Sequence, residues 1–429
     1  MDDFERWPFA PVDNLPESFQ NRWWAECFLP TPAYETLQNQ PHWAVIVGGV
    51  GCGKSILLRA LKQAKNPADI ILDLSAADSP RQGAGSETSL FQDIMTLAAR
   101  EFSYRFSDEP LLLEKISSTQ REYVRWLIEK FMGRRPYLVF LDGLDAGARK
   151  IMEAVDFIEL YATQTETLDV QGQITELCNL GKSLGSQNIL VLVDTVSYAS
   201  KEQLVKLLDY LGWLEPMHHR GFAVIVAISQ TLFEIYKLDA LMRGRVKIIS
   251  VETSPQGTYA VVGKRLLAAT ADKVQTLEQI ADKKLLDSLG KMIELEFGAL
   301  SPGPLVNLTE LLLDLNQRGE KLDEQHFERV RERFYLKYLP LRLHAQPQRL
   351  GVWRGHRFIP LDAGVYELLQ RLAKSGVESW GGKGGNEYLH TLASRLRKAI
   401  EPDPKNPFYL QNRRNEGYWL EGLAEKQPR

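Results

Sequence analysis

Cysteine is scarce in this chain of 429 residues, which has only Cys27, Cys52 and Cys178. These three lie too far apart for the ligand spacing of a metal site and are too few for a disulfide framework. An excess of either charge is also missing, because 52 lysines and arginines face 55 aspartates and glutamates. Any nucleic-acid binding must therefore come from a local patch rather than from overall charge. We expect a reducing, cytoplasmic location.

Long hydrophobic runs are absent as well. No stretch of about 18 apolar residues occurs, and the acidic start of the sequence leads into no apolar segment. We therefore expect neither secretion nor a membrane span. Apolar residues make up 44% and charged residues 25%, close to the averages of folded soluble proteins, which excludes wholesale disorder and fibrous architectures. At roughly 100 to 200 residues per domain, the length favours about two to four domains.

Short apolar runs alternate with helical patterns in residues 41–254. We expect strands at 43–47, 70–74, 137–141, 189–193, 222–228 and 246–251. This alternation predicts an α/β core, in which a mainly parallel sheet has helices on both faces.

Three further segments differ from this core in texture. Residues 1–40 are rich in proline and aromatic residues without a clear period, and we expect an arm packed on the rest of the chain. Residues 255–340 show helical patterns only. Residues 341–424 combine short extended pieces with helices, which predicts a third, small α+β domain that folds on its own. Residues 425–429 are expected to be a solvated tail.

Residues 48–55, with the sequence Gly-Gly-Val-Gly-Cys-Gly-Lys-Ser, have the spacing of a P-loop and lie between an expected strand and an expected helix. The glycines allow backbone N–H groups to turn onto phosphate oxygens at a helix N-terminus. We expect Lys54 to neutralise the β- and γ-phosphates of ATP and Ser55 to ligate Mg²⁺. The predicted nucleotide contacts are Gly48, Gly49, Val50, Gly51, Cys52, Gly53, Lys54, Ser55 and Ile56.

A P-loop ATPase also needs an acidic residue at the end of a neighbouring strand, to hold the magnesium shell. Asp194 and Asp142 both follow an expected strand. We favour Asp194, because two expected strands remain after it, as a five-stranded core requires. Choosing Asp142 leaves one strand over, and Asp145 could then assist it. Both alternatives stay open on the sequence.

The arrangement over residues 41–338 resembles the AAA+ and STAND branches of P-loop ATPases, particularly origin-recognition-type members in which the core and a helical lid precede a winged helix. The resemblance implies that Ser229 or Gln230 senses the γ-phosphate. It also implies that Arg243 or Arg245 is an arginine finger offered to a neighbouring subunit.

Two features depart from the AAA+ pattern. Thr195, rather than a glutamate that polarises water, follows Asp194, and residues 301–304 open a lid helix where a second-sensor arginine would be expected nearby. We therefore expect hydrolysis to be slow. The Asp-Gly-Leu-Asp run at 142–145 resembles the STAND form of the acidic motif, which is the reason to keep Asp142 as the alternative.

Residues 341–424 resemble the OmpR-type winged helix of bacterial response regulators. The match consists of opening strands at 350–361, a first helix at 364–373, a recognition helix at 388–400 and a wing at 408–420. Four apolar residues of the recognition helix, at i, i+3, i+7 and i+11, form one stripe that is expected to be buried. The outward residues expected to contact DNA are Thr391, Ser394, Arg395 and Lys398, with Arg413 and Arg414 from the wing.

The sequence thus predicts a bacterial ATPase switch that binds ATP and Mg²⁺, assembles in the ATP state and engages double-stranded DNA, as a regulator or defence-type sensor. One alternative is an initiator or transposition-type ATPase that loads partners on DNA. The other is a protein-interaction scaffold whose winged helix binds an unidentified protein, since Glu387, Glu401 and Asp403 dilute the basic surface.

Overall fold

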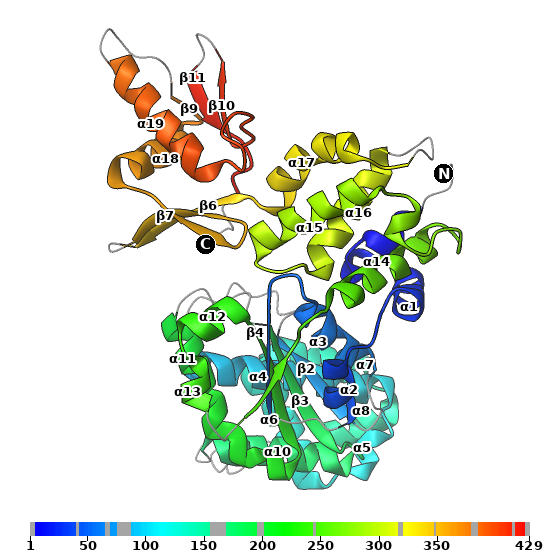
Figure 1. Cartoon of the computed structure of the whole chain (residues 1–429). Helices are drawn as coiled ribbons and strands as arrows, with labels where there is room; N and C mark the ends of the chain where they lie inside the picture. The colour runs from blue at the N-terminus through cyan, green and yellow to red at the C-terminus, as the bar shows by residue number, and fades with distance from the viewer. Residues whose placement is uncertain are drawn as a thin grey trace. The chain divides into compact units, whose positions relative to one another are not determined.

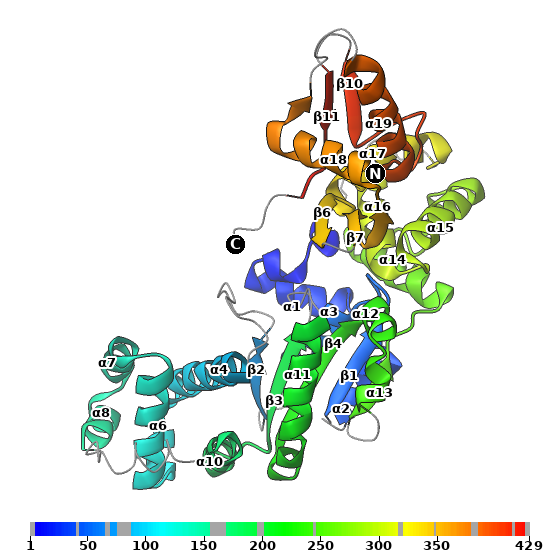
Figure 2. The ribbon, with the colours of Figure 1, turned by 90° about the vertical axis from the view of Figure 1, so that its left-hand side faces the viewer.

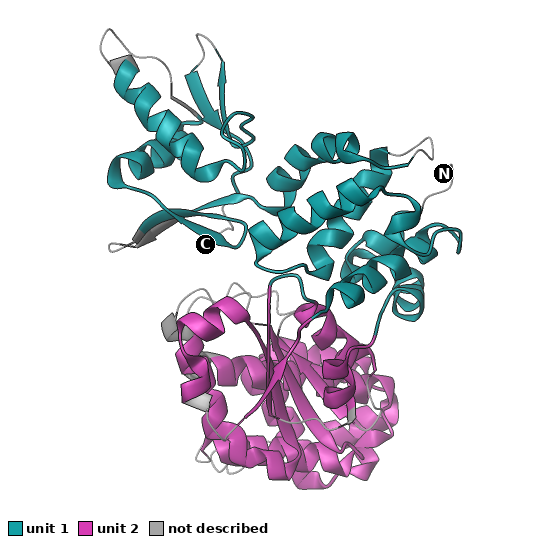
Figure 3. Ribbon diagram, in the orientation of Figure 1, with its two compact units in different colours: residues 1–29, 50–52, 253–429 teal, residues 30–49, 53–252 magenta. Residues whose placement is uncertain are grey.

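The computed structural model describes residues 5–39, 43–64, 69–74, 87–154, 169–194, 201–242, 246–315, 321–346, 349–378, 385–413 and 417–424. The chain divides into two compact units (Figure 3). We call residues 30–49 and 53–252 the sheet unit, and residues 1–29, 50–52 and 253–429 the C-terminal unit. No helix in the described ranges is long and apolar enough to cross a membrane.

The sheet unit is built on five parallel strands in the order β2-β3-β4-β1-β5. Figure 2 labels β1 to β4 of this sheet. The bounds of the strands are Ala44–Gly48 for β1, Asp69–Asp73 for β2, Asn188–Asp194 for β3, Phe222–Ser229 for β4 and Lys247–Ser250 for β5. All five were expected from their apolar runs. β1 is buried along its whole length, as is typical of a parallel strand covered on both faces.

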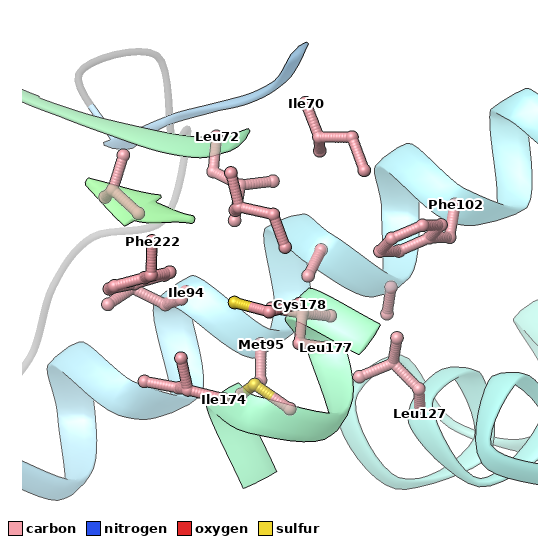
Figure 4. Packing of buried hydrophobic residues seen from close by; sticks show 14 of the residues in the cluster. Ile70, Leu72, Ile94, Met95, Phe102, Leu127, Ile174, Leu177, Cys178 and Phe222 are labelled. Carbon is pink, nitrogen blue, oxygen red and sulfur yellow. The ribbon is translucent and has the colours of Figure 1, made fainter. Parts of the chain in front are cut away.

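Helices cover this sheet on both faces. The helices of the sheet unit are α2 (Pro32–Asn39), α3 (Lys54–Gln63), α4 (Glu87–Asp108), α5 (Leu112–Lys115), α6 (Ser118–Phe131), α7 (Arg134–Gly143), α8 (Ala146–Glu153), α10 (Val170–Ser183), α11 (Lys201–Leu214), α12 (Gln230–Ile235) and α13 (Leu238–Met242), with the short η5 (Glu215–Arg220). Helices α4 to α8 gather on the side where β2 forms the edge (Figure 2). On one face, side chains of β2 and β4 pack on α4, α6 and α10 (Figure 4).

The expected strand at 137–141 is wrong, because these residues belong to helix α7. Tyr137, Phe140 and Leu141 are buried, whereas Leu138 and Val139 are half exposed or more. Burial at i, i+3 and i+4 is the helical period. A run of five apolar residues does not show its period in the sequence, so it is compatible with either structure.

The C-terminal unit begins with the aromatic-rich arm, which contains helices that its sequence did not predict. The elements are η1 (Trp7–Phe9), η2 (Val12–Asn14) and α1 (Glu17–Glu26). Trp23 of α1 is buried, and the guanidinium carbon of Arg265 lies 3.9 Å from the centre of its ring. Arg265 also donates to the carbonyl of Pro8 at 2.7 Å. These contacts fasten the arm to a helical layer.

That helical layer occupies the range expected for the lid. It consists of α14 (Pro255–Ala269), η6 (Leu277–Gln279), α15 (Lys283–Phe297), α16 (Pro302–Leu315) and α17 (Glu324–Tyr338). Side-chain caps begin several of these helices, such as Ser254 for α14, Asp282 for α15 and Asp323 for α17. Each cap accepts a hydrogen bond from a backbone N–H group in the first turn of its helix, which fixes where the helix starts.

The last part of the chain forms the expected α+β module. An antiparallel sheet of β6 (Leu341–Gln346), β7 (Arg349–Arg354) and β8 (Arg357–Pro360) comes first. Helix α18 (Ala363–Ser375), β9 (Val377–Glu378), helix α19 (Gly385–Ile400), β10 (Leu410–Arg413) and β11 (Gly417–Leu420) follow, and the second sheet has the order β10-β11-β9. The predicted fold class, an α/β core with a helical lid and a C-terminal α+β winged helix, is confirmed.

The helical layer and the α+β module share one hydrophobic core, and a buried ion pair crosses between them. Arg354 of β7 donates from Nη2 and Nε to the carboxylate of Glu296 in α15, at 2.6 and 3.1 Å. Its Nη1 donates to the carbonyl of Ile400, the last residue of α19, at 2.8 Å. The hydroxyl of Tyr409 donates to the carbonyl of Leu339 at 2.7 Å. The module is therefore fixed to the helical layer by hydrogen bonds as well as by apolar packing.

Candidate nucleotide and DNA sites

The phosphate loop joins β1 to α3 at the carboxyl end of the sheet. Gly53 directly precedes α3 with a φ of 102°, and Gly51 has a φ of 74°. Residues with a Cβ atom rarely adopt such backbone angles, so the turn requires glycine at both positions. Of the other predicted nucleotide contacts, Cys52 is buried and Ile56 lies in the first turn of α3. The first amides of this helix open onto the loop, where a helix N-terminus favours an anion.

Lys54 is the first residue of α3, and its side chain folds back over the loop. The Nζ atom donates to the carbonyl of Gly48 at 3.0 Å and to that of Gly49 at 2.7 Å. These two bonds hold a positive charge at the loop. A lysine ammonium is a compact charge with three donors, which suits it to phosphate oxygens.

Ser55 and Asp194 are 139 residues apart in the sequence and form a hydrogen bond in the structure. The Ser55 hydroxyl donates to Oδ2 of Asp194 at 2.5 Å. Asp194 ends β3, and β4 lies between β3 and β1, so the sheet order brings these two residues to the same end of the sheet. The favoured acidic residue thus lies at the phosphate loop.

Ser229 is the last residue of β4, the strand between β3 and β1. It pairs in register with Gly48, the residue at which the phosphate loop begins. The Oγ of Ser229 accepts a hydrogen bond from the N–H of Leu232 at 3.3 Å and so caps α12. Gln230 donates instead to Glu234 of its own helix. Of the two predicted sensors, Ser229 is the one whose backbone adjoins the loop.

Asp142 lies inside a helix and Asp145 directly before one, so neither follows a strand. Asp142 lies in α7, exposed to solvent, and pairs with Arg149 at 3.0 Å. Asp145 caps α8 by accepting a hydrogen bond from the N–H of Ala148 at 2.8 Å. The alternative acidic site rested on a strand at 137–141, so the helix found there removes its structural basis.

Four residues of the sequence analysis lie outside the described residues. They are Thr195, Arg243, Arg245 and Arg414. The arginine-finger assignment, and half of the predicted wing contact, therefore remain predictions.

Helix α19 presents the expected polar face. Thr391, Ser394, Arg395 and Lys398 are all exposed, whereas Leu392, Leu396 and Ile400 of the predicted apolar stripe are buried and Leu389 is partly buried. Arg413 at the end of β10 is exposed as well. The Oγ1 of Thr391 donates to the carbonyl of Glu387, within the helix, at 2.9 Å. Cationic and hydroxyl side chains thus share one face with a wing strand beside it.

Two residues that the sequence analysis did not single out connect α19 to the hairpin. Arg397 donates from Nη2 to the carbonyl of Leu410 at 2.9 Å and to the side-chain oxygen of Asn412 at 3.1 Å. Nδ1 of His390 and the hydroxyl of Tyr418 are hydrogen-bonded at 2.8 Å, and burial raises the pKa of Tyr418. The wing is thereby positioned against the helix.

The expectation that Glu401 dilutes the basic surface is wrong, because its side chain is buried. Its carboxylate accepts hydrogen bonds from the backbone N–H groups of Phe408, Tyr409 and Leu410 at 2.6 to 3.2 Å. Burial raises the pKa of Glu401, and the three N–H donors oppose that shift. Glu401 therefore belongs to the framework that holds the start of the wing.

Comparisons with known proteins add little to this geometry. No protein-family model matches the sequence, and no curated protein matches it either. Among solved structures, the Orc1 protein of Aeropyrum pernix in complex with DNA is similar over 98% of this chain and 94% of its own, with 11% identity and a TM-score of 0.38. At that distance the similarity assigns neither an activity nor a partner.

Proposed function

We propose that this protein is an ATP-binding switch of the AAA+ type, with the P-loop as its nucleotide site and the winged helix as its contact with double-stranded DNA. The observation that carries the proposal is the hydrogen bond of Ser55 to Asp194 beside Lys54. A serine hydroxyl, a carboxylate at a strand end and a lysine on the loop are the groups that nucleotide phosphates and their metal require.

The donor set at this point fits Mg²⁺. Ser55 and Asp194 offer hard oxygen atoms within hydrogen-bond distance of one another, and Mg²⁺ prefers such ligands. These two residues would hold the ion, which when bound supplies charge neutralisation to the phosphates. Lys54 orients and neutralises the same phosphates, and the α3 amides donate to them.

The proposed cycle is slow, because Thr195 follows Asp194 where a water-polarising carboxylate would otherwise stand. A long-lived ATP state suits a switch better than a motor. We propose that Arg243 or Arg245 reaches the nucleotide of a neighbouring copy, so that ATP favours assembly. Several winged helices would then act together, which raises DNA affinity through effective concentration.

The winged helix is proposed to be of the OmpR type and to use α19 in the major groove and Arg413 at the wing. The role as a regulator or defence-type sensor is the first choice for this architecture, and loading of partners on DNA is the alternative. Turnover stimulated by duplex DNA would favour the loader, whereas slow turnover with ATP-dependent assembly would favour the switch.

The decisive test is titration of the full chain with ATP, with and without Mg²⁺. Lys54→Ala is expected to weaken binding about tenfold or more, because it removes a charge-assisted contact. Asp194→Asn should lose the dependence on Mg²⁺, while the matched control Asp142→Asn keeps it. Light scattering of the same samples measures assembly.

Two results would contradict the assignment of the nucleotide site. One is unchanged ATP affinity in the Lys54→Ala variant with its fold intact by circular dichroism. The other is loss of the magnesium dependence in Asp142→Asn rather than in Asp194→Asn.

A further inference from the structure

Arg395 and Asp362 form an ion pair between the two long helices of the winged helix. Nη2 of Arg395, on the exposed face of α19, lies 2.7 Å from Oδ2 of Asp362, just before α18. Both side chains are about half exposed, at 55% and 46%. The pair thus lies at the surface proposed to meet DNA (Figure 1 shows the two helices).

The carboxylate of Asp362 is itself fixed. Its Oδ1 accepts a hydrogen bond from the N–H of Val365 at 3.1 Å, which caps α18, while Oδ2 accepts the one from Arg395. A carboxylate held at two points gives the guanidinium a defined direction. Arg395 uses one nitrogen for this bond, and a guanidinium carries five N–H donors in a planar fork.

Arg397, two positions away, has a different environment. Its Nη2 is turned onto the hairpin, where it bonds Leu410 and Asn412. Arg395 is exposed and lies on the same side of the helix as Ser394 and Lys398, so its remaining donors are open to a ligand. Among the cations of α19, Arg395 alone combines exposure with a bond to a carboxylate in the described residues.

We propose that Asp362 determines sequence specificity, by orienting Arg395 for a bidentate contact to guanine in the major groove. This inference rests on the proposed engagement of DNA. Guanine offers the two acceptors O6 and N7, which match the fork of an oriented arginine. The carboxylate also repels phosphate, so binding is disfavoured at sites where Arg395 finds no guanine and the negative charge is not compensated.

The test compares variants of the full chain for affinity and base preference on a library of randomised duplexes. Asp362→Asn keeps the cap, because asparagine caps a helix as well as aspartate. It should bind random duplex at least as tightly as the wild type, yet lose preference for guanine at one position by roughly tenfold. Arg395→Gln should lose the same preference. Glu367→Gln, which removes an exposed carboxylate from α18, should leave the preference for guanine unchanged.

The outcomes separate this inference from the proposed function. If the wild type selects guanine and Asp362→Asn selects it equally well, the ion pair only joins two helices and the inference is overturned. If no variant, including the wild type, binds duplex DNA at low salt with ATP present, both the inference and the DNA contact are overturned. Circular dichroism of Asp362→Asn checks that α18 is intact.

Discussion

The sheet unit and the C-terminal unit bury different kinds of side chain. Among the described residues, the sheet unit buries no charged side chain. The C-terminal unit buries four charged side chains, which are Arg265, Glu296, Arg354 and Glu401. The first unit is therefore specified by its apolar pattern. The second also depends on buried charges, of which Arg354 and Glu296 pair with each other, while Arg265 and Glu401 bind backbone groups.

This difference matters because the two kinds of core respond differently to change. A missing methyl group in an apolar core costs an amount that scales with the cavity left behind. A missing partner in a buried ion pair leaves an uncompensated charge, which costs more than the net value of the pair. The comparison can be tested by breaking one element in each unit.

The largest effect is expected from Glu296→Ala, which leaves the guanidinium of Arg354 buried without its carboxylate. We expect the free energy of unfolding of the C-terminal unit to fall by about 3 to 5 kcal/mol. Replacing both partners, as in Glu296→Leu with Arg354→Met, should restore most of that loss, because two apolar groups leave no charge unpaired. Denaturant unfolding and hydrogen exchange measure the change.

The exposed Glu294 of the same helix provides the control, and Glu294→Ala should change stability little. If the single Glu296→Ala variant were no less stable than the double variant, the buried pair would not be a determinant of this unit. The ion pair between Arg354 and Glu296 also argues against independent folding of residues 341–424, because a fragment that begins at 341 would lack Glu296.

A smaller effect is expected in the sheet unit from Ile225→Val. Ile225 is fully buried at the centre of β4, and removal of one methylene should lower the free energy of unfolding by about 0.5 to 1.5 kcal/mol. Hydrogen exchange should rise for amides of the sheet and stay unchanged for α15 and α19. Equal changes in both units would mean that they unfold as one, which would weaken the contrast between their cores.

The same contrast explains how much of the fold the sequence could predict. Strands such as 189–193 and 222–228 are buried on both faces, and their continuous apolar runs are visible without knowledge of any partner. Residues 137–141 have the same appearance but are helical, because only the tertiary packing shows that two of the five face solvent. Period cannot be read from so short a run.

The candidate sites were predictable to a similar degree. The phosphate loop has its own local chemistry, and Asp194 followed from counting the strands that come after it. The Arg395–Asp362 pair depends on how two helices pack, so no local signal indicates it, although an aspartate just before a helix predicts a cap. Glu401 was misassigned because its position after α19 does not show that it points inward.

The smallest effect concerns the dependence of stability on pH, and Glu401 is its source. Burial raises the pKa of this carboxyl above its ordinary value despite three N–H donors. The folded state thus holds the proton more tightly than the unfolded state. This tighter proton binding stabilises the folded state. The stabilisation is fully present below the pKa of Glu401 in the unfolded state, about 4.3, and is lost as pH rises through its pKa in the folded state.

Glu401→Gln tests this sign, because an amide cannot ionise. At the lowest pH the wild-type carboxyl is protonated, and its hydroxyl oxygen keeps lone pairs that an amide NH2 group lacks. The variant should therefore be less stable there, and its deficit relative to the wild type should shrink as pH rises above about 4.3. Unfolding free energies at several pH values, with Glu387→Gln as an exposed control, measure the deficit. A deficit that grows with pH would mean that the N–H donors outweigh burial and that the pKa of Glu401 is lowered instead. The ionised carboxylate of Glu401 would then be stabilised in the core by its three backbone N–H donors. The difference between the charged core of the C-terminal unit and the apolar core of the sheet unit would then be larger.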